Sequence, residues 1–309
     1  MRINVLFPGQ GAQYPNMGMD FYETFETYRN IVDKTSEALG EDLLRILQDE
    51  DELKETRNSQ LAIFSMGYGI GQLIKEAGVK IDSALGLSLG EYSALAMAKS
   101  LTLDQTLYLL KKRSQFMEEA TQERETFLMA VSFLDKEKVQ EVLDCEDEVY
   151  LANENAPNQN VVGGPKTKEE HIKEKMMAAG AKKVTSLMVS GAFHTPFMET
   201  ASKAFKEELA KVDIKFPKIP VLSNFKGDYY EERDDMREIL ARHISHGVKL
   251  VKGLQKLESQ DEDYHLIIGP GKAFASILKQ NKIPGRVLKV GTVEEFYEAI
   301  TILKEKTNE

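Results

Sequence analysis

Short apolar runs alternate with longer amphipathic stretches along most of this chain. Residues 3–7 form an apolar run that predicts a buried strand, and residues 60–77 are apolar on most sides, as is typical of a buried helix. A second apolar run leads into a glycine-rich turn at residues 86–90, and residues 91–98 have a helical pattern. Strands that alternate with helices in this way predict an α/β fold with a mostly parallel sheet.

The same periodicity predicts further elements on both sides of a central segment. Before it, helices are expected over residues 20–39, 43–48 and 102–120, with an acidic connection over 49–55. After it, helices are expected up to residue 210 and over 235–244, 248–257, 272–279 and 293–304, and strands over 220–224, 265–268 and 286–290. Residues 1–124 and 191–309 are therefore predicted to form one large, discontinuous α/β-hydrolase-like domain.

The central segment has a different pattern. Its strands and helices are expected in the order strand 127–133, helix 136–143, strand 149–153, strand 160–163, helix 168–179 and strand 183–189. This β-α-β-β-α-β order is ferredoxin-like. Residues 125–190 are therefore predicted to be a small domain inserted into the larger one.

Composition narrows the classes of partner and compartment. The 309 residues are 42% hydrophobic and carry a net charge of −10, which argues against nucleic acid as a partner. A single cysteine, Cys145, excludes an internal disulfide and fits a reducing cytosol. The first residues are too short for a signal sequence, and no apolar run approaches the length of a membrane span. A cytoplasmic protein without a metal-ligand cluster is expected.

The sequence Gly86-Leu87-Ser88-Leu89-Gly90 lies between a predicted strand and a predicted helix. A serine in this Gly-x-Ser-x-Gly context is typical of a nucleophile elbow, in which the hydroxyl projects beside the free N–H groups of a helix N-terminus. Taken alone, the motif is suggestive only, because an ordinary glycine-rich turn has this pattern by chance in roughly one chain in ten of this length.

A serine nucleophile requires a base, and His194 is the strongest of five histidines. It follows a predicted strand, and loops at strand ends carry sites in α/β sheets. His171 lies on a charged helix face and His265 begins a buried strand. His243 and His246 are three residues apart, so they could face a ligand together or serve surface roles.

Two further segments are ambiguous from their residues alone. Residues 8–13 form a glycine loop that fits neither a P-loop nor a dinucleotide fingerprint, because Tyr14 occupies the place of the third glycine. It is either a turn or a loop that brings backbone N–H groups to a ligand. Arg113 ends a Lys-Lys-Arg run, which favours a solvated helix face unless the arginine binds an anion.

The motifs occur in the order seen in malonyl-CoA:acyl-carrier-protein transacylases, and the chain resembles that family nearly from end to end. The segments that carry the resemblance are residues 7–13, 86–95, 112–117, 153–164, 191–195 and 268–271. The resemblance implies malonyl transfer from malonyl-CoA to the phosphopantetheine thiol of acyl carrier protein, in fatty-acid biosynthesis and without a tightly bound cofactor.

The resemblance also assigns roles to the reacting groups. Ser88 would be the nucleophile and His194 the general base and then acid. The backbone N–H groups of Gln10 and Leu89 would form the oxyanion hole. The family supplies no aspartate for the histidine, and a backbone carbonyl near Val248-Lys249 would orient the imidazole instead.

The substrate-binding set implied by the resemblance comprises Arg113, Met117, Phe193, Asn155 and His243. Arg113 would grip the free malonyl carboxylate, since a planar guanidinium matches a carboxylate through two hydrogen bonds. Phe193 would crowd a 2-methyl branch. Many members have glutamine near the position of His243; if that glutamine helps to place the substrate carboxylate, His243 could substitute for it.

Three alternatives remain open at this stage. The same Ser-His pair could serve a hydrolase of acyl carrier proteins or esters, although such an enzyme has no use for a buried cation at Arg113. The acceptor could belong to polyketide synthesis, with the chain as a trans-acting acyltransferase. A non-catalytic carrier-binding module is disfavoured by the intact set of Ser88, His194 and Gln10.

Overall fold

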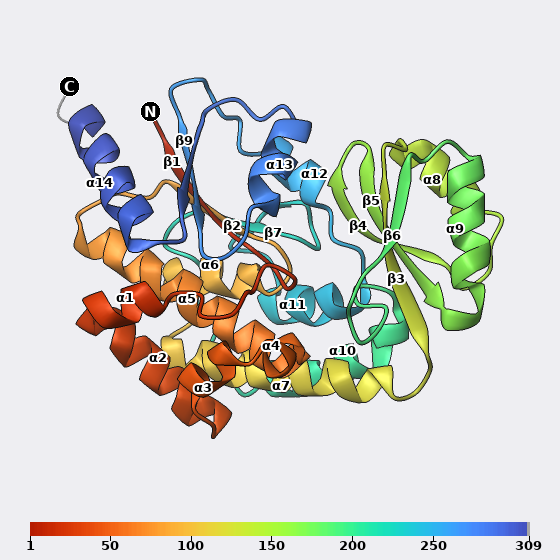
Figure 1. Cartoon of the computed structure of the whole chain (residues 1–309), viewed down its shortest axis with the longest axis horizontal. Helices are drawn as coiled ribbons and strands as arrows, with labels where there is room; N and C mark the ends of the chain where they lie inside the picture. Colours follow the sequence, from red (N-terminus) through yellow and green to blue (C-terminus); the bar gives the residue numbers. More distant parts are fainter. Residues whose placement is uncertain (308–309) are drawn as a thin grey trace.

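The larger part of the molecule is built on a six-stranded sheet. A computed structural model describes residues 1–307 (Figure 1). The strand order is β10-β9-β1-β2-β7-β8, and all neighbours pair in parallel except β8, which is antiparallel to β7. The strands span Arg286–Val290 (β10), Tyr264–Ile268 (β9), Ile3–Phe7 (β1), Ser83–Gly86 (β2), Val221–Ser223 (β7) and Asp228–Tyr229 (β8). The predicted α/β fold with a mostly parallel sheet is confirmed.

Strand β1 lies in the middle of this sheet and brings two loops together. All five of its residues are buried, as expected for a parallel strand with both faces covered. Phe7 is in register with Gly86 of β2. The glycine loop after β1 and the turn after β2 therefore leave the same edge of the sheet side by side.

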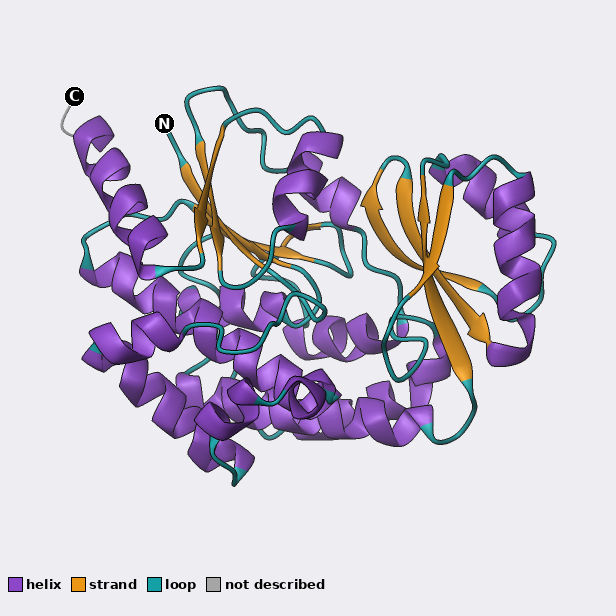
Figure 2. Ribbon diagram, viewed as in Figure 1, coloured by secondary structure: helices purple, strands orange, loops and turns teal. Residues whose placement is uncertain are grey.

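Helices cover this sheet and fill the lower half of the view in Figure 2. Those that precede the smaller unit are Met19–Thr24 (α1), Glu26–Leu39 (α2), Leu43–Gln48 (α3), Glu50–Lys54 (α4), Thr56–Glu76 (α5), Gly90–Met97 (α6) and Leu103–Thr121 (α7). Two predictions need correction here. The helix expected over residues 20–39 is interrupted at Phe25, whose extended backbone turns its ring onto Phe296. The acidic connection expected over 49–55 contains α4, because the Asp49 carboxylate accepts hydrogen bonds from the first helical N–H groups.

The helix predicted to be buried over residues 60–77 is α5, and it packs closely through its glycines. A Cβ atom at Gly69 would lie 2.6 Å from the ring of Tyr28 in α2. At Gly67 a Cβ atom would lie 3.1 Å from the ring of Phe7. These contacts explain why the helix carries glycine despite its cost to helix stability.

The segment between α7 and α10 folds as a smaller unit with its own sheet (Figure 1). Its elements are Thr126–Ser132 (β3), Lys136–Leu143 (α8), Tyr150–Ala156 (β4), Gln159–Pro165 (β5), a short 3-10 turn Lys166–Lys168, Glu169–Ala178 (α9) and Lys183–Ser186 (β6). The sheet is antiparallel with the order β4-β5-β3-β6, and a separate apolar cluster fills the space beneath α8 and α9. Strand β6 ends at Ser186, three residues earlier than expected.

The chain then returns to the larger part. A short 3-10 turn, Pro196–Met198, precedes Glu199–Leu209 (α10), and the remaining helices are Met236–Ser245 (α11), Leu250–Gln255 (α12), Ala273–Gln280 (α13) and Val293–Thr307 (α14). The two-residue strand β8 was not predicted, because two residues carry no usable periodicity. Val248, between α11 and α12, joins the two parts: it forms an isolated parallel bridge with Asn153 of β4.

None of the helices within residues 1–307 combines the length and apolarity needed to span a bilayer. The same residues contain no cluster of three or more histidine, cysteine or acidic side chains placed to hold a metal ion.

Candidate active site

The turn between β2 and α6 has the geometry of a nucleophile elbow. Ser88 has a φ of 54°, a left-handed conformation that costs a non-glycine residue about 1–3 kcal/mol. The two glycines allow the surrounding backbone to close on this turn: a Cβ atom at Gly86 would lie 1.8 Å from the carbonyl carbon of Gly90. At Gly90 a Cβ atom would lie 2.3 Å from the carbonyl oxygen of Phe7. Neither position accepts a larger residue without moving the main chain.

The imidazole of His194 lies within hydrogen-bond distance of the Ser88 hydroxyl. Its Nε2 lies 2.8 Å from the Ser88 Oγ, and its Nδ1 lies 2.7 Å from the carbonyl oxygen of His243. A carbonyl accepts only, so Nδ1 carries the proton and Nε2 is the free base that faces the serine hydroxyl. His194 also has a left-handed φ of 61°.

The acceptor of His194 differs from the one expected. The prediction of a carbonyl near Val248-Lys249 is wrong, because the imidazole bonds the carbonyl of His243 in the last turn of α11. Carbonyls in the last turn of a helix lack an intrahelical partner, so this one is available to an outside donor.

Burial sets the protonation state of the base. His194 is only 5% exposed. Burial and the neighbouring Arg113 guanidinium lower the pKa of His194 to about 3, and the hydrogen bond to the His243 carbonyl opposes the shift only partly. The imidazole is therefore neutral at ordinary pH and ready to accept a proton.

Arg113 brings a buried positive charge to the nucleophile. It belongs to α7, is 1% exposed, and its Nη2 donates to the Ser88 Oγ at 3.0 Å. Its Nη1 donates to Oε1 of Gln60 at 2.6 Å. Within residues 1–307 no carboxylate lies at ion-pair distance from this guanidinium. Burial lowers the pKa of Arg113, and the nearby Tyr92 and Glu91 oppose the shift. A buried cation without an anion is costly, so the arrangement suits an anionic ligand beside Ser88.

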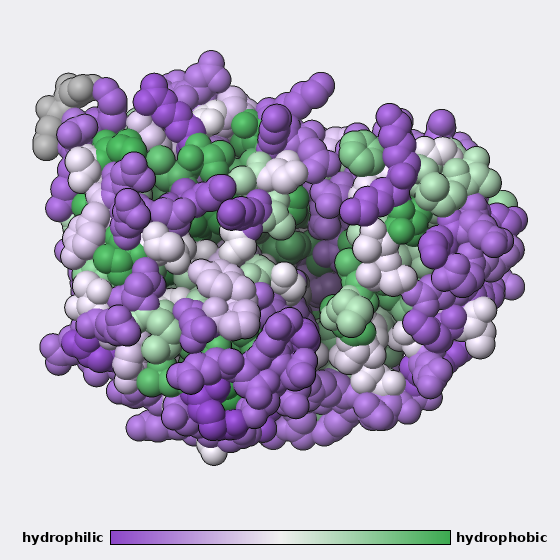
Figure 3. Space-filling view, viewed as in Figure 1, coloured by the Kyte–Doolittle hydropathy of each residue, from purple (hydrophilic) through white to green (hydrophobic). Residues whose placement is uncertain are grey.

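A cavity of about 150 Å³ opens in front of Ser88 and His194, between the two parts of the molecule. The space-filling view shows a hollow there, with apolar side chains along it (Figure 3). The residues that line the cavity are Gly9, Gln10, Leu87, Ser88, Met117, Leu128, Asn153, Asn155, Val161, Leu187, Val189, Phe193 and His194. Four of the residues expected from the sequence to bind substrate or oxyanion thus line one cavity: Gln10, Met117, Asn155 and Phe193.

The glycine loop lies against the elbow. A Cβ atom at Gly9 would lie 2.7 Å from the carbonyl oxygen of Leu87. In the part of the chain that the structure describes, the backbone N–H groups of Gln10 and Leu89 have no hydrogen-bond acceptor. Leu89 also caps α6, where the helix dipole favours negative charge. Both N–H groups are therefore free to bind an oxyanion.

The chain matches the family model described as an acyl transferase domain over residues 5–270. It is 34% identical to a malonyl CoA-acyl carrier protein transacylase of Bacillus subtilis over 99% of both chains. The corresponding protein of Staphylococcus aureus (strain MRSA252) is 29% identical, over 94% of this chain and 96% of the relative. This chain belongs to the malonyl-CoA:acyl-carrier-protein transacylase family.

Solved structures of the transacylase family have the same fold. The malonyl CoA-acyl carrier protein transacylase of Clostridium perfringens superposes with a TM-score of 0.93 at 32% identity, over 99% of this chain and 98% of that one. A malonyl-transacylase in complex with a type II PKS acyl-carrier protein gives a TM-score of 0.93 at 27% identity, over 98% of this chain and 100% of that chain. The resemblance predicted from the motifs is confirmed.

Three of the residues expected at the site do not line this cavity: Leu89, Arg113 and His243. Of these, His243 lies behind His194. Its ring stacks on that of His194, with centroids 4.8 Å apart, and does not line the cavity. Its Nδ1 lies 3.2 Å from Oε2 of Glu91, although neither ring nitrogen has a well-aligned hydrogen bond within residues 1–307. Burial lowers the pKa of His243 well below its usual value, so the ring is neutral. The structure places this residue behind the base and outside the lining of the cavity.

Sequence reasoning missed a polar group beneath the elbow. Glu91 is fully buried, and its carboxylate accepts hydrogen bonds from the Tyr230 hydroxyl at 2.5 Å and from the Asn224 backbone N–H at 3.1 Å. Burial raises the pKa of the Glu91 carboxyl to about 7, and those two hydrogen bonds oppose the rise. The available signal was a lone acidic residue at the start of the otherwise apolar helix α6.

The remaining candidates lie away from the cavity. His171 pairs with Glu146 on the surface at 2.8 Å, and His265 is buried with its Nε2 at 2.8 Å from the carbonyl of Pro284. His246 contacts Arg242. Cys145 is exposed and distant from Ser88 in the fold, on the smaller unit.

Proposed function

We propose that this chain transfers a malonyl group from malonyl-CoA to the phosphopantetheine thiol of acyl carrier protein, through an acyl ester on Ser88. The observation that carries the proposal is the unpaired, buried guanidinium of Arg113 at 3.0 Å from the Ser88 Oγ. A plain acyl group needs no cation there, whereas the free carboxylate of malonate does.

In the first half-reaction, His194 takes the proton from the Ser88 hydroxyl while Oγ attacks the thioester carbonyl carbon. The carbonyl oxygen becomes an oxyanion, which the N–H groups of Gln10 and Leu89 stabilise; such a donor is worth about 3 kcal/mol of barrier. The carbon–sulfur bond then breaks, and the protonated His194 returns its proton to the departing CoA sulfur.

In the second half-reaction the thiol of the carrier's phosphopantetheine arm takes the place of CoA. His194 accepts the thiol proton, the sulfur attacks the Ser88 ester, and the proton returns to the serine oxygen as the ester breaks. The backbone carbonyl of His243 keeps the imidazole in the tautomer that both steps require. We assign this orienting role to His243 in place of the substrate contact expected from its position.

Substrate binding also changes the pKa of His194. The malonyl carboxylate on Arg113 would offset the positive charge that helps to lower the pKa of His194. The basicity of His194 therefore rises when the correct substrate is bound. Phe193 and Met117 form apolar walls of the cavity, and Asn155 offers a polar contact from β4. Phe193 narrows the space for a 2-methyl branch.

We further propose that the molecule has the domain organisation expected from its sequence. Residues 125–190 are an inserted ferredoxin-like domain, and residues 1–124 and 191–309 form the α/β-hydrolase-like catalytic domain. The strand order β6-β3-β5-β4 and the separate apolar cluster support this division. The protein acts in the cytoplasm in fatty-acid biosynthesis, with malonyl-CoA as substrate and no tightly bound cofactor.

A polyketide carrier is the second acceptor to test, because one structural relative is a malonyl-transacylase in complex with a type II PKS acyl-carrier protein. The test is intact-protein mass spectrometry after mixing the enzyme with malonyl-CoA. We expect a malonyl adduct that is absent from Ser88→Ala and that discharges onto a fatty-acid carrier protein. Rapid loss of the adduct to water without any carrier would favour a hydrolase. Discharge only onto a polyketide carrier would assign the enzyme to polyketide synthesis instead of fatty-acid synthesis.

A further inference from the structure

Asn224 follows β7, the strand beside β2, and its side chain spans the nucleophile elbow. Its Oδ1 accepts a hydrogen bond from the backbone N–H of Ser88 at 2.9 Å. Its Nδ2 donates to the carbonyl oxygen of Gly86 at 2.6 Å. Asn224 is 1% exposed, so water cannot replace either bond. One side chain thus holds the main chain on both sides of Leu87.

Only an amide of this length offers what the elbow needs. Asparagine presents an acceptor and a donor in one plane, and these match the Ser88 N–H and the Gly86 carbonyl. An aspartate at this position would turn a carboxylate oxygen towards the Gly86 carbonyl. An apolar side chain would leave both backbone groups buried and unpaired. Because Ser88 has a left-handed φ, the turn persists only where its surroundings hold it in place.

Asn224 is itself fixed by its main chain. Its N–H donates to Oε2 of Glu91 at 3.1 Å, and its carbonyl accepts from the N–H of Lys249 at 2.9 Å. Glu91 lies three residues after Ser88, so the side chain and the backbone of Asn224 contact the two ends of the same turn.

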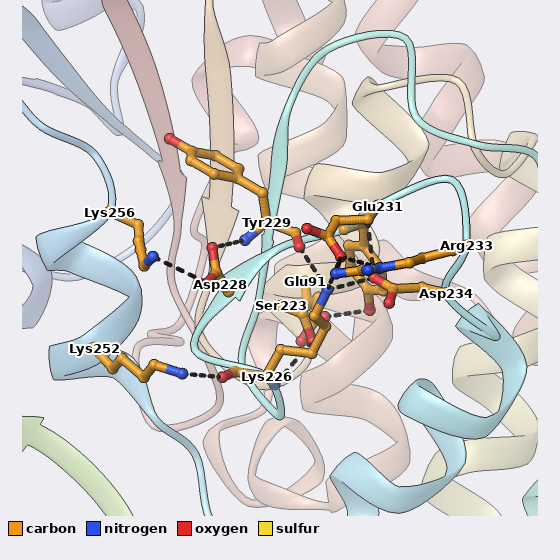
Figure 4. A network of polar contacts seen from close by, with 11 residues as sticks. Glu91, Ser223, Lys226, Asp228, Tyr229, Glu231, Arg233, Asp234, Lys252 and Lys256 are labelled. Atoms are coloured by element: carbon orange, nitrogen blue, oxygen red, sulfur yellow. Dashed lines mark hydrogen bonds and ion pairs between the residues drawn. The ribbon is translucent and has the colours of Figure 1, made fainter.

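Polar contacts stabilise the hairpin that contains Asn224 (Figure 4). Lys226 pairs with Asp234 and donates to the carbonyl of Tyr229. The backbone N–H of Lys226 donates to the hydroxyl of the buried Ser223 at 3.4 Å, and Figure 4 shows Ser223 and Glu91 within this network. The hydroxyl of Tyr230, in the same hairpin, donates to the second oxygen of Glu91. The polar contacts thus run from the surface to the floor of the elbow.

We propose that Asn224 is a positioning residue that holds the Ser88 hydroxyl in reach of His194 and beside the oxyanion N–H groups. The assignment rests on the proposed role of Ser88 as the acylated nucleophile. Asn224 does not line the cavity, so it acts on the rate of acylation and not on the binding of malonyl-CoA. A displacement of the nucleophile by about 1 Å is enough to slow such a step about 100-fold.

The test compares Asn224→Ala and the isosteric Asn224→Asp with the wild type. We expect both to lower the kcat of malonyl loading by about 10- to 100-fold with little change in KM. Both should slow labelling by a small fluorophosphonate, a serine-reactive probe that does not use the malonyl site, by the same factor. Asn4→Ala is the matched control: Asn4 is 2% exposed in β1 and accepts from the Ser83 hydroxyl at 2.6 Å. It should lose thermal stability and keep its kcat.

The outcomes separate this assignment from the proposed function. If Ser88→Ala still formed the malonyl adduct, the proposed function would fail whatever Asn224 does. If the adduct required Ser88 but both Asn224 variants loaded at the wild-type rate, only the positioning role would be overturned. A rise in KM with unchanged kcat, or equal kcat losses in Asn224→Ala and Asn4→Ala, would overturn it as well. Circular dichroism establishes whether each variant is folded. If Asn224→Ala does not fold, Asn224→Asp still tests the assignment, because it preserves the volume of the side chain.

Discussion

The guanidinium Nη2 of Arg113 lies 3.0 Å from the hydroxyl oxygen of Ser88, in a place where Arg113 is 1% exposed. This contact joins two residues that the sequence separates by a helix and a turn. It puts a permanent positive charge within one hydrogen bond of the atom that carries the acyl group. The most direct predictions concern this charge.

Arg113→Ala should lower kcat/KM for malonyl-CoA by about 100-fold, because it removes a charge-assisted pair of hydrogen bonds. Loading from acetyl-CoA should rise, since the acetyl group no longer meets an unpaired cation. The rates are measured from adduct formation on Ser88 with each thioester. Lys112→Ala, on the same helix but partly exposed, is the control and should change neither rate. Equal losses with both thioesters would exclude a carboxylate clamp.

The pH dependence of acylation should report the buried state of His194. Its pKa is lowered to about 3, so the neutral base predominates at every pH above that value. We expect kcat/KM for the loading of Ser88, which reports the free enzyme, to change little between about pH 5 and about pH 8, where a solvent-exposed histidine would lose activity below about 6.5. His194→Ala should slow loading by about 10²- to 10⁴-fold. A steep loss of rate below pH 6.5 in the wild type would show that the imidazole is not desolvated.

Glu91 should make the fold less stable as the pH rises. Its pKa is raised from 4.5 to about 7, so between these values the folded protein keeps a proton that the unfolded chain has already lost. The free energy of unfolding therefore decreases with rising pH across this window, by up to about 3 kcal/mol from this group.

The substitution Glu91→Gln isolates this contribution, because the amide does not titrate. The free energies of unfolding of both proteins are measured by urea denaturation. From pH 4.5 to pH 7 the wild type should lose stability relative to Glu91→Gln. The lowered pKa of His194 acts in the opposite direction below its usual value, but it is common to both proteins. A pH-independent difference would mean that Glu91 is ionised throughout.

Gly86→Ala should prevent the elbow from closing. The added Cβ atom would lie 1.8 Å from a backbone carbon of Gly90, which cannot move aside as a side chain could. We expect a loss of more than about 4 kcal/mol of stability, seen as a collapse of the melting temperature or of soluble yield. Gly253→Ala in α12 is the matched control, because its nearest atom would be 4.0 Å from the new methyl group. That change should be neutral or stabilising.

The order of helices and strands could be read from the sequence because it depends on local hydrophobic periodicity. The elbow could be found because Gly86 and Gly90 must be glycine for steric reasons that are also local. The acceptor of His194 could not be found, because a main-chain carbonyl has no signature in the identity of its residue. In this chain the identity of the side chain at His243 indicated a substrate contact, and not a main-chain acceptor for His194.

Long-range polar contacts escaped prediction for a related reason. Glu91 and Asn224 are 133 positions apart, and nothing in either local segment indicates that they meet. The burial of Arg113 was also hidden, because Lys111 and Lys112 beside it are typical of a solvated helix face. The helical repeat turns adjacent residues in different directions, so Arg113 enters the core while Lys112 remains partly exposed.

The bridge at Val248 carries a consequence for how the enzyme opens. Val248 exchanges hydrogen bonds with Ala152 and Glu154 of β4, on either side of the cavity residue Asn153. The next residue, Lys249, donates to the carbonyl of Asn224 beneath the elbow. An outward displacement of β4 that widened the cavity for a phosphopantetheine arm would therefore also displace Asn224, which holds Ser88. The main chain from Val248 to Lys249 thus connects the cavity wall at Asn153 to the side chain that holds Ser88.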